Sequence, residues 1–304
     1  SLNLMKALIG RSSVPFDDKD YKNKSSDDFR IQNLGNQNYK YYGRAQVLVM
    51  NGGEKLSPVI RVSEQNKSLI PYDKLKLSSE VKSKLEDCVM SKSGIVLVCG
   101  ATGSGKSTTL SSLTGLLLEK RSRDRIEEIS KPVEAYIDNI SQIDIGDAAV
   151  SIADMVQSET RRNAQILIIS ELNEFGVLRA AVELAMQGKL VLSTLHAVSD
   201  SFVFDRVRGM CLENEDIYNQ FVELIIGVTH QTMVKEACPS CSEWVLVEKL
   251  PQAKKDVLKA FNYRNEKIKV NGDSSMCDKC GGIGVLINKP VIISSILEVD
   301  NTMR

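Results

Sequence analysis

The stretch Cys99–Leu110 reads CGATGSGKSTTL and decides the fold. Residues 100–107 fit G-x-x-x-x-G-K-[ST], a pattern in which a glycine-rich turn joins a strand to a helix. GIVLVCG (94–100) is a short apolar run typical of a buried strand. GKSTTLSSLTGLLLEK (105–120) places Leu110, Leu113 and Leu117 on one helical face. This strand-turn-helix unit predicts an α/β fold built on a parallel sheet.

The same turn has the chemistry of a phosphate site. Its backbone N–H groups and the helix N-terminus favour the α/β-phosphates of a nucleotide. Lys106 is expected to reach the β/γ-phosphates of ATP, and the Ser107 hydroxyl to bind Mg²⁺. The alternative is a glycine-rich turn that binds no ligand. The predicted nucleotide contacts of this segment are Gly100, Ala101, Thr102, Gly103, Ser104, Gly105, Lys106, Ser107 and Thr108.

Strand-like and helix-like segments alternate after this turn, as in a parallel sheet covered by helices. They are RIEEI (125–129), ADMVQSETRR (153–162), QILIIS (165–170), EFGVLRAAVELAMQG (174–188) and KLVLSTLH (189–196). Before the turn, the pattern predicts strands at 41–50 and 58–62 around an Asn-Gly-Gly turn, a linker at 66–77 and a helix at 78–92. Residues 11–40 are polar and turn-rich, and predict loop or edge structure.

Length and composition limit the classes of function. The 304 residues suffice for about two domains, and 42% of them are hydrophobic, which argues against global disorder. Lys+Arg and Asp+Glu number 39 each, so no basic field indicates a nucleic-acid partner. No apolar run approaches a membrane span, and the first residues do not resemble a signal peptide. Because the chain starts at Ser1 without Met, we expect a fragment or an added first residue.

Two polar residues follow predicted strands and are candidates for catalysis. Glu171 comes directly after QILIIS, at the strand end where open α/β sheets bind ligands. There it is either the general base that activates water or the capping acid of the next helix. His196 ends KLVLSTLH and is either a sensor of the γ-phosphate or an ordinary structural histidine.

Four of the seven cysteines form two C-x-x-C pairs, Cys238 with Cys241 and Cys277 with Cys280. Two such pairs complete a tetrahedral Cys₄ site that holds structural Zn²⁺ and leaves no open position for catalysis. Two unrelated pairs or a redox dithiol are the alternatives. The long spacer between the pairs must fold as an insertion, with PQAKKDVLKAF (251–261) as its candidate helix.

Taken together, these motifs resemble the hexameric ATPases of type II secretion and type IV pilus assembly, from about Arg44 to the end of the chain. GKLVLSTLHAV (188–198) is similar to the family's G-H-L-V-L-S-T-L-H-T, and HQTMVKEACPSC (230–241) to its A-Q-R-L-V-x-x-L-C-P-x-C. Gln142 and Gly146 match its Q-x-x-V-G. The four cysteines make the chain more similar to the assembly and secretion branch of this family than to the retraction ATPases, which usually lack them.

Other matches are divergent. The acidic box E-D-P-[IV]-E resembles 130–134, where Ser130 and Lys131 replace two acids and Glu134 is kept. SELNE (170–174) resembles the Walker B string G-E-x-R-D. Glu171 is kept, whereas Ser170 replaces the glycine and Asn173-Glu174 replaces R-D. The family's D-P-D before this strand is replaced by RRNAQ. With these departures, the chain resembles a divergent member of the family, of the type IVb pilus or conjugative pilus kind.

The resemblance implies a RecA-like P-loop core over 71–304, an α+β N-terminal domain over 1–70 that is truncated at its start, and a zinc-binding insertion at 236–284. It implies that Glu134 assists at Mg²⁺, and that Arg44, Arg61 and Arg206 reach the nucleotide, some from a neighbouring subunit. From the residues alone, Arg44 and Arg61 read as ordinary surface charges of strands.

The implied function is that of a cytoplasmic homo-hexamer, peripheral at the inner membrane and without a span of its own. Such a hexamer hydrolyses ATP to move a platform protein that assembles pilin or pseudopilin subunits. Because two box acids are missing, a second hypothesis is an ATP-binding structural or adaptor subunit with a weakly hydrolytic site. A third, a nucleic-acid motor, is disfavoured by the balanced charge.

Overall fold

The computed structural model describes residues 26–34, 41–50, 55–64, 69–131, 133–145, 151–260, 265–271, 275 and 277–299. The first of these form a three-stranded antiparallel sheet in the order β1-β2-β3. Its strands are β1 (Ser26–Leu34), β2 (Tyr41–Met50) and β3 (Lys55–Glu64). The strands predicted at 41–50 and 58–62 are confirmed, and the turn predicted between them lies outside the described residues.

The largest sheet of the described residues has seven strands, in the order β12-β9-β4-β8-β7-β5-β6. From β9 to β6 all neighbours are parallel. At the other edge, Thr229 Oγ1 donates to Ser295 O and Val299 N to Ile226 O, so β12 runs antiparallel to β9. The bounds are β4 (Gly94–Cys99), β5 (Ile126–Ser130), β6 (Ser141–Asp144), β7 (Ile166–Ile169), β8 (Leu190–Leu195), β9 (Ile225–Ala237) and β12 (Val285–Glu298).

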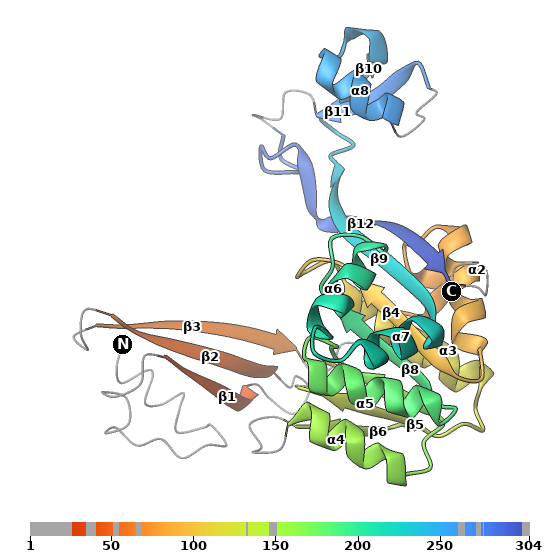
Figure 1. Ribbon diagram of the computed structural model, residues 1–304. Helices are drawn as coiled ribbons and strands as arrows, with labels where there is room; N and C mark the ends of the chain where they lie inside the picture. Colours follow the sequence, from red (N-terminus) through yellow and green to blue (C-terminus); the bar gives the residue numbers. More distant parts are fainter. Residues whose placement is uncertain are drawn as a thin grey trace. The chain divides into compact units, whose positions relative to one another are not determined.

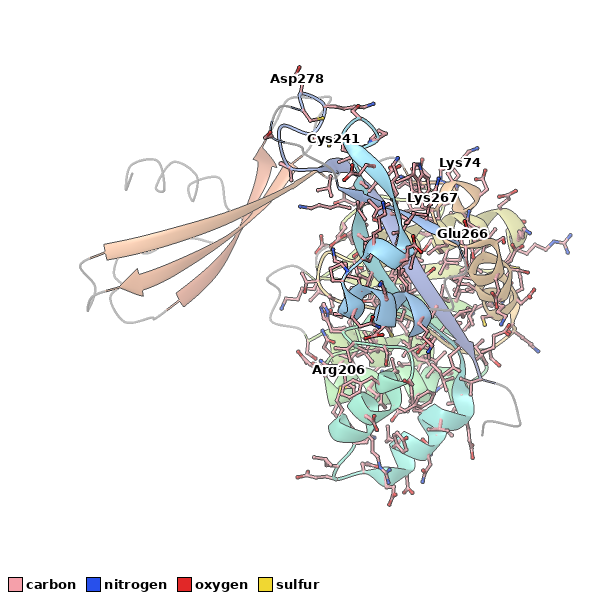
Figure 2. The ribbon with its side chains drawn as sticks, turned by 90° about the horizontal axis from the view of Figure 1, so that it is seen from above. Lys74, Arg206, Cys241, Glu266, Lys267 and Asp278 are labelled. Atoms are coloured by element: carbon pink, nitrogen blue, oxygen red, sulfur yellow. The ribbon has the colours of Figure 1, made fainter. Side chains whose placement is uncertain are left out.

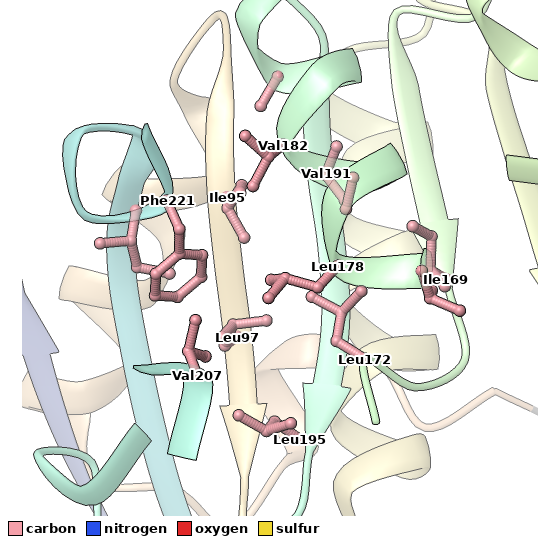
Figure 3. Close-up of a cluster of buried hydrophobic side chains, with 14 of the residues drawn as sticks. Ile95, Leu97, Ile169, Leu172, Leu178, Val182, Val191, Leu195, Val207 and Phe221 are labelled. Atoms are coloured by element: carbon pink, nitrogen blue, oxygen red, sulfur yellow. The ribbon is translucent and has the colours of Figure 1, made fainter. Parts of the chain in front are cut away.

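Helices cover both faces of this sheet, as the predicted class requires (Figure 1). The helices are α2 (Ser79–Met90), α3 (Lys106–Lys120), α4 (Ile152–Ser158), α5 (Phe175–Met186), α6 (Phe202–Met210) and α7 (Glu215–Leu224). In Figure 3, Ile95 and Leu97 of β4 point into one apolar cluster with Leu178 of α5 and Phe221 of α7. Every residue of β4 is buried, which explains its uninterrupted apolar sequence.

Two segments differ from the sequence prediction. Residues 69–77 are more than a linker, because Tyr72 begins a 3-10 turn and is buried together with Leu75 and Leu77. The helix predicted at 153–162 ends at Ser158 and continues as a 3-10 turn to Arg161. The helix predicted at 78–92 is confirmed as α2, which begins after a cap in which Val81 N donates to Ser78 Oγ.

The chain divides into two compact units, residues 1–230 with 295–304 and residues 231–294. The second unit contains β10 (Ser242–Leu246) paired antiparallel with β11 (Lys267–Asn271), and α8 (Gln252–Ala260). The helix predicted at 251–261 is therefore confirmed. The boundary predicted near residue 70 stays a prediction. None of the helices in the described part of the chain has both the length and the apolar character that a bilayer crossing requires.

Two carboxylates are fully buried near the start of β5 and the end of α4. Glu127 contacts Arg125 at 2.6 Å and Arg162 at 3.3 Å, and Glu159 contacts Arg162 at 3.3 Å. Burial and the neighbouring Glu127 raise the pKa of Glu159 to about 7. Burial also acts to raise the pKa of Glu127, but the hydrogen bond from Glu159 and the two arginines hold it below its ordinary value. The pair therefore shares one proton.

This shared proton predicts a pH-dependent stability. The pKa of Glu159 is raised from 4.5 to about 7. The contribution of this protonated acid to the free energy of unfolding is therefore full below pH 4.5 and is lost as the pH rises through 7. Glu159→Gln imitates the protonated acid, so we expect it to stabilise the protein by roughly 3 kcal/mol at pH 8 and to change little at pH 4.5. Urea unfolding at both pH values measures this, with the exposed Glu119→Gln as control. An equal effect of Glu159→Gln at both pH values would contradict the shared proton.

Candidate active site

The turn between β4 and α3 requires glycine at two positions. Gly103 has φ of 78° and Gly105 has φ of 89°, both in the left-handed region. A side chain there costs roughly 1–2 kcal/mol. Gly105 is also the N-cap of α3, and its carbonyl accepts a hydrogen bond from Thr109 N at 3.0 Å. The sequence pattern is thus explained by the backbone path that brings Lys106 to the first position of the helix.

The Lys106 ammonium lies among three acceptors. Its Nζ donates to Gly100 O at 3.0 Å and to Ala101 O at 3.1 Å, and it is 3.3 Å from His196 Nδ1. Burial lowers the pKa of Lys106, and the nearby carboxylates of Glu171 and Glu134 oppose that shift. An ammonium has three N–H donors, so a bound phosphate must replace at least one of these acceptors.

His196 connects this lysine to Glu171. Lys106 is charged and has no lone pair, so the 3.3 Å contact requires that His196 Nδ1 accept the hydrogen bond. In neutral imidazole the other nitrogen then carries the proton, and His196 Nε2 lies 2.7 Å from Glu171 Oε1. The three side chains therefore form one polar chain in which the tautomer of the histidine is determined by its partners.

Two adjacent strands of the sheet hold Glu171 and His196 together. β7 and β8 are parallel neighbours, so their carboxyl ends lie side by side. Leu172 N donates to Thr194 O at 2.9 Å, and Thr194 Oγ1 donates to Ser170 O at 2.7 Å. These bonds place both side chains at the ligand-binding edge that the sequence predicts for Glu171.

A cavity of about 290 Å³ opens at this edge. Its wall is formed by the glycine-rich turn at 100–107 (the P-loop) with the start of α3, by the end of β5 with the loop after it, and by the ends of β7 and β8. The residues that line it are Thr102, Gly103, Lys106, Ser107, Leu110, Ser111, Thr114, Glu128, Ser130, Lys131, Glu134, Ala135, Ile168, Ser170, Glu171, Thr194 and His196. Four predicted catalytic residues, Lys106, Glu134, Glu171 and His196, thus share one cavity.

One cavity carboxylate was not among the predicted residues. Glu128 of β5 accepts hydrogen bonds from Ser130 Oγ at 2.6 Å and from Gln142 Nε2 at 2.6 Å, one on each oxygen. Burial raises the pKa of Glu128, and these two donors oppose the shift. The signal in the sequence is the two-residue spacing between Glu128 and Ser130, which puts both side chains on one face of a strand.

The cavity also offers ligands for Mg²⁺. Ser107 supplies a hydroxyl, and Glu128, Glu134 and Glu171 supply carboxylates that line the same space. Magnesium prefers oxygen ligands and usually keeps several waters, which one or two carboxylates can hold. The residues present therefore fit the ion that the sequence predicts.

Three further predicted contacts are arginines, one on α6, one on β2 and one on β3. Arg206, which is labelled in Figure 2, is exposed on α6 and is not among the residues that line the cavity. Arg44 of β2 and Arg61 of β3 are directly opposite each other in the antiparallel register. Arg30 of β1 is in turn opposite Arg44, so the three arginines occupy one row of the sheet. Contact of these arginines with a nucleotide stays a prediction.

The two C-x-x-C pairs come together in the second unit. Their four Sγ atoms lie within 4.8 Å of one another. Cys238 Sγ is 3.8 Å from Cys277 Sγ, and Cys241 Sγ is 3.7 Å from Cys280 Sγ. A tetrahedral site with Zn–S bonds of about 2.3 Å separates its sulfur atoms by about 3.8 Å. Gly284 N also donates to Cys280 Sγ at 3.2 Å, as expected for a thiolate ligand. The geometry fits structural zinc.

The strand order, the glycine turn between β4 and α3, and the lysine at the start of α3 define a P-loop protein with a RecA-like core. The chain matches the family described as "Type II/IV secretion system protein" over residues 9–303, and it belongs to that family. The predicted resemblance and fold class are both confirmed.

Individual relatives agree with this membership. The chain is 28% identical over 223 residues to "Putative type II secretion system protein E" of Escherichia coli K12, covering 73% of this chain and 43% of the relative. It is 26% identical over 242 residues to "Type II secretion system ATPase E" of Vibrio cholerae, covering 79% and 45%. The chain thus spans less than half the length of these relatives.

A solved structure shows the same fold. The ATPase DotB of Legionella pneumophila superimposes with a TM-score of 0.65 at 19% identity, covering 99% of this chain and 69% of that one. The likeness concerns the fold.

Proposed function

We propose that this protein binds Mg²⁺-ATP in the cavity at the P-loop and hydrolyses it. The observation that carries the proposal is the polar chain from Lys106 through His196 to Glu171, inside a cavity that also holds Ser107. Lys106 binds the β/γ-phosphates and stabilises the negative charge of the transition state. Glu171 orients the attacking water and accepts its proton. Mg²⁺, when bound, neutralises charge on the phosphates.

His196 is suited to report the state of the phosphates. Its Nδ1 now accepts from Lys106, and its Nε2 lies against Glu171. When Lys106 turns towards a γ-phosphate, that contact is weakened and the imidazole is free to rotate or to donate to the phosphate. Either change alters its hydrogen bond to the catalytic base, so the histidine couples phosphate binding to the position of Glu171.

The work that hydrolysis drives is proposed from the relatives. We infer a homo-hexamer at the cytoplasmic face of the inner membrane, which moves a platform protein and so assembles pilin or pseudopilin subunits. Arg44, Arg61 and Arg206 then complete the site from the N-terminal sheet or from a neighbouring subunit, and 1–70 acts as a separate domain. Assembly of the site between subunits predicts turnover that rises steeply with protein concentration.

Lys106→Ala tests the proposal. It removes the cation that contacts the phosphates, so we expect turnover to fall at least about a hundredfold and nucleotide binding to weaken. Phosphate release, measured at several protein concentrations with sedimentation to follow oligomers, gives the result. Lys92→Ala, an exposed lysine before β4, is the matched control.

The second candidate is an adaptor that binds ATP without turning it over. It is favoured by Ser130 and Lys131, which line the cavity where the family carries two acids. Stoichiometric ATP binding by an oligomer that releases no phosphate would select it over the ATPase.

A further inference from the structure

We propose that Glu128 takes the place of an acid missing from the acidic box, and that its carboxylate binds the hydrated Mg²⁺ of the nucleotide complex. The inference deepens the proposed function and rests on it for the identity of the ligand. It concerns a residue that lies two positions before the segment in which the box acids are expected.

The geometry of β5 allows this exchange of position. Residues two apart on a strand project from the same face, about 6.6 Å from each other along the strand. The Glu128 side chain spans that separation, because its Oε1 lies 2.6 Å from Ser130 Oγ. The negative charge therefore arrives beside the side chain of Ser130, where the family has its first box acid.

The carboxylate is also oriented. Gln142 Nε2 donates to Glu128 Oε2 at 2.6 Å and to Ala135 O at 2.9 Å, while Gln142 Oε1 accepts from Ile137 N at 2.8 Å. One amide thus joins Glu128 to the loop that carries Glu134. Gln142 is a positioning residue, because it fixes the carboxylate and the loop relative to each other without lining the cavity itself.

The surroundings of Glu128 favour a cation in the cavity. Glu128, Glu134 and Glu171 line one space with Ser107. Three carboxylates that face a triphosphate repel it unless a divalent cation lies between them. Each Glu128 oxygen keeps a free lone pair after its one hydrogen bond, and that lone pair can accept from a water ligand of the cation.

The test measures binding rather than turnover. A fluorescent, non-hydrolysable ATP analogue is titrated into the full chain with Mg²⁺ and, separately, with EDTA. For Glu128→Gln we expect the gain in affinity that Mg²⁺ brings to fall by roughly tenfold, the value of one lost charge-assisted hydrogen bond. Affinity in EDTA is expected to stay equal or to rise, because one repelling charge is gone. Equal losses in Mg²⁺ and in EDTA would overturn the proposal, as would an unchanged gain.

Two further variants guard against simple damage to the fold. Asp138→Asn removes the same charge from an exposed position of the neighbouring loop, and should leave the Mg²⁺ gain intact. Glu128→Ser should lose the gain, and adding Ser130→Glu to it should restore the gain by returning the acid to the family's position. Failure of this exchange, in a protein with unchanged thermal unfolding, overturns the assignment.

The two proposals fail separately. If the wild-type oligomer releases no phosphate but Glu128→Gln loses the Mg²⁺ gain, hydrolysis is wrong and the role of Glu128 stands. If the wild type turns over ATP and Glu128→Gln binds Mg²⁺-nucleotide normally, the role of Glu128 is wrong and hydrolysis stands.

Discussion

Glu171→Gln is expected to lower the turnover of ATP by about 10²–10⁴-fold while nucleotide binding is kept. The amide preserves the size of the side chain, and its oxygen can still accept from His196 Nε2, now 2.7 Å away. It cannot accept a proton from water. Phosphate release at saturating ATP measures the loss, and the affinity for a non-hydrolysable analogue measures what is retained.

The neighbouring Glu174 provides a matched control. It is exposed at the N-terminus of α5 and does not line the cavity, so Glu174→Gln should leave turnover near that of the wild type. Near-full activity of Glu171→Gln at saturating ATP would show that another group activates the water. A loss of binding as large as the loss of turnover would point to damage of the site instead of loss of the base.

Removal of zinc from the four cysteines is expected to unfold residues 231–294. Structural zinc contributes on the order of 10 kcal/mol to small folds, which is comparable to the whole free energy of unfolding of a domain. The described part of this unit holds the β10–β11 pair, α8, a 3-10 turn and the ends of β9 and β12, a core too limited for independent stability. We expect one zinc per chain, and rapid hydrogen exchange across 231–294 after chelation.

The rest of the chain is the internal reference in that experiment. Amides of β4 and β8 should stay protected, because every residue of both strands is buried in the other unit. Cys241→Ser should reproduce the effect of chelation, whereas Cys211→Ala, at a lone buried thiol, should not change the zinc content. Protein that contains no metal and keeps 231–294 protected would refute a structural zinc site.

Local signals in the sequence were sufficient for the central motifs. The strand, turn and helix around Lys106 are contiguous, and their glycines report a backbone conformation that other residues rarely adopt. Glu171 and His196 each end a buried strand, so the topology of a parallel sheet alone placed them at one edge. The spacing of the cysteines anticipated a cluster because two thiolates three residues apart can bind the same ion.

Other features depended on segments that are distant in sequence. Glu127 and Glu159 meet only because α4 lies beside β5, and nothing in either local sequence marks a buried carboxylate pair. Glu128 precedes the segment that resembles the acidic box, and its proposed role depends on Gln142, which lies on the neighbouring strand β6. The strand β12 was not among the predicted strands, and its place in the sheet depends on its pairing with β9, which is distant in sequence.

The antiparallel pairing of β9 with β12 has a consequence for how such a chain gains and loses parts. The second compact unit begins after His230 and ends before Ser295, and Thr229 Oγ1 donates a hydrogen bond of 2.8 Å to Ser295 O. The two ends of this segment are therefore adjacent, so a tight hairpin turn placed there would join β9 directly to β12 and only shorten both strands. The segment that carries the four cysteines is in this sense a separable insertion between two neighbouring strands of the sheet.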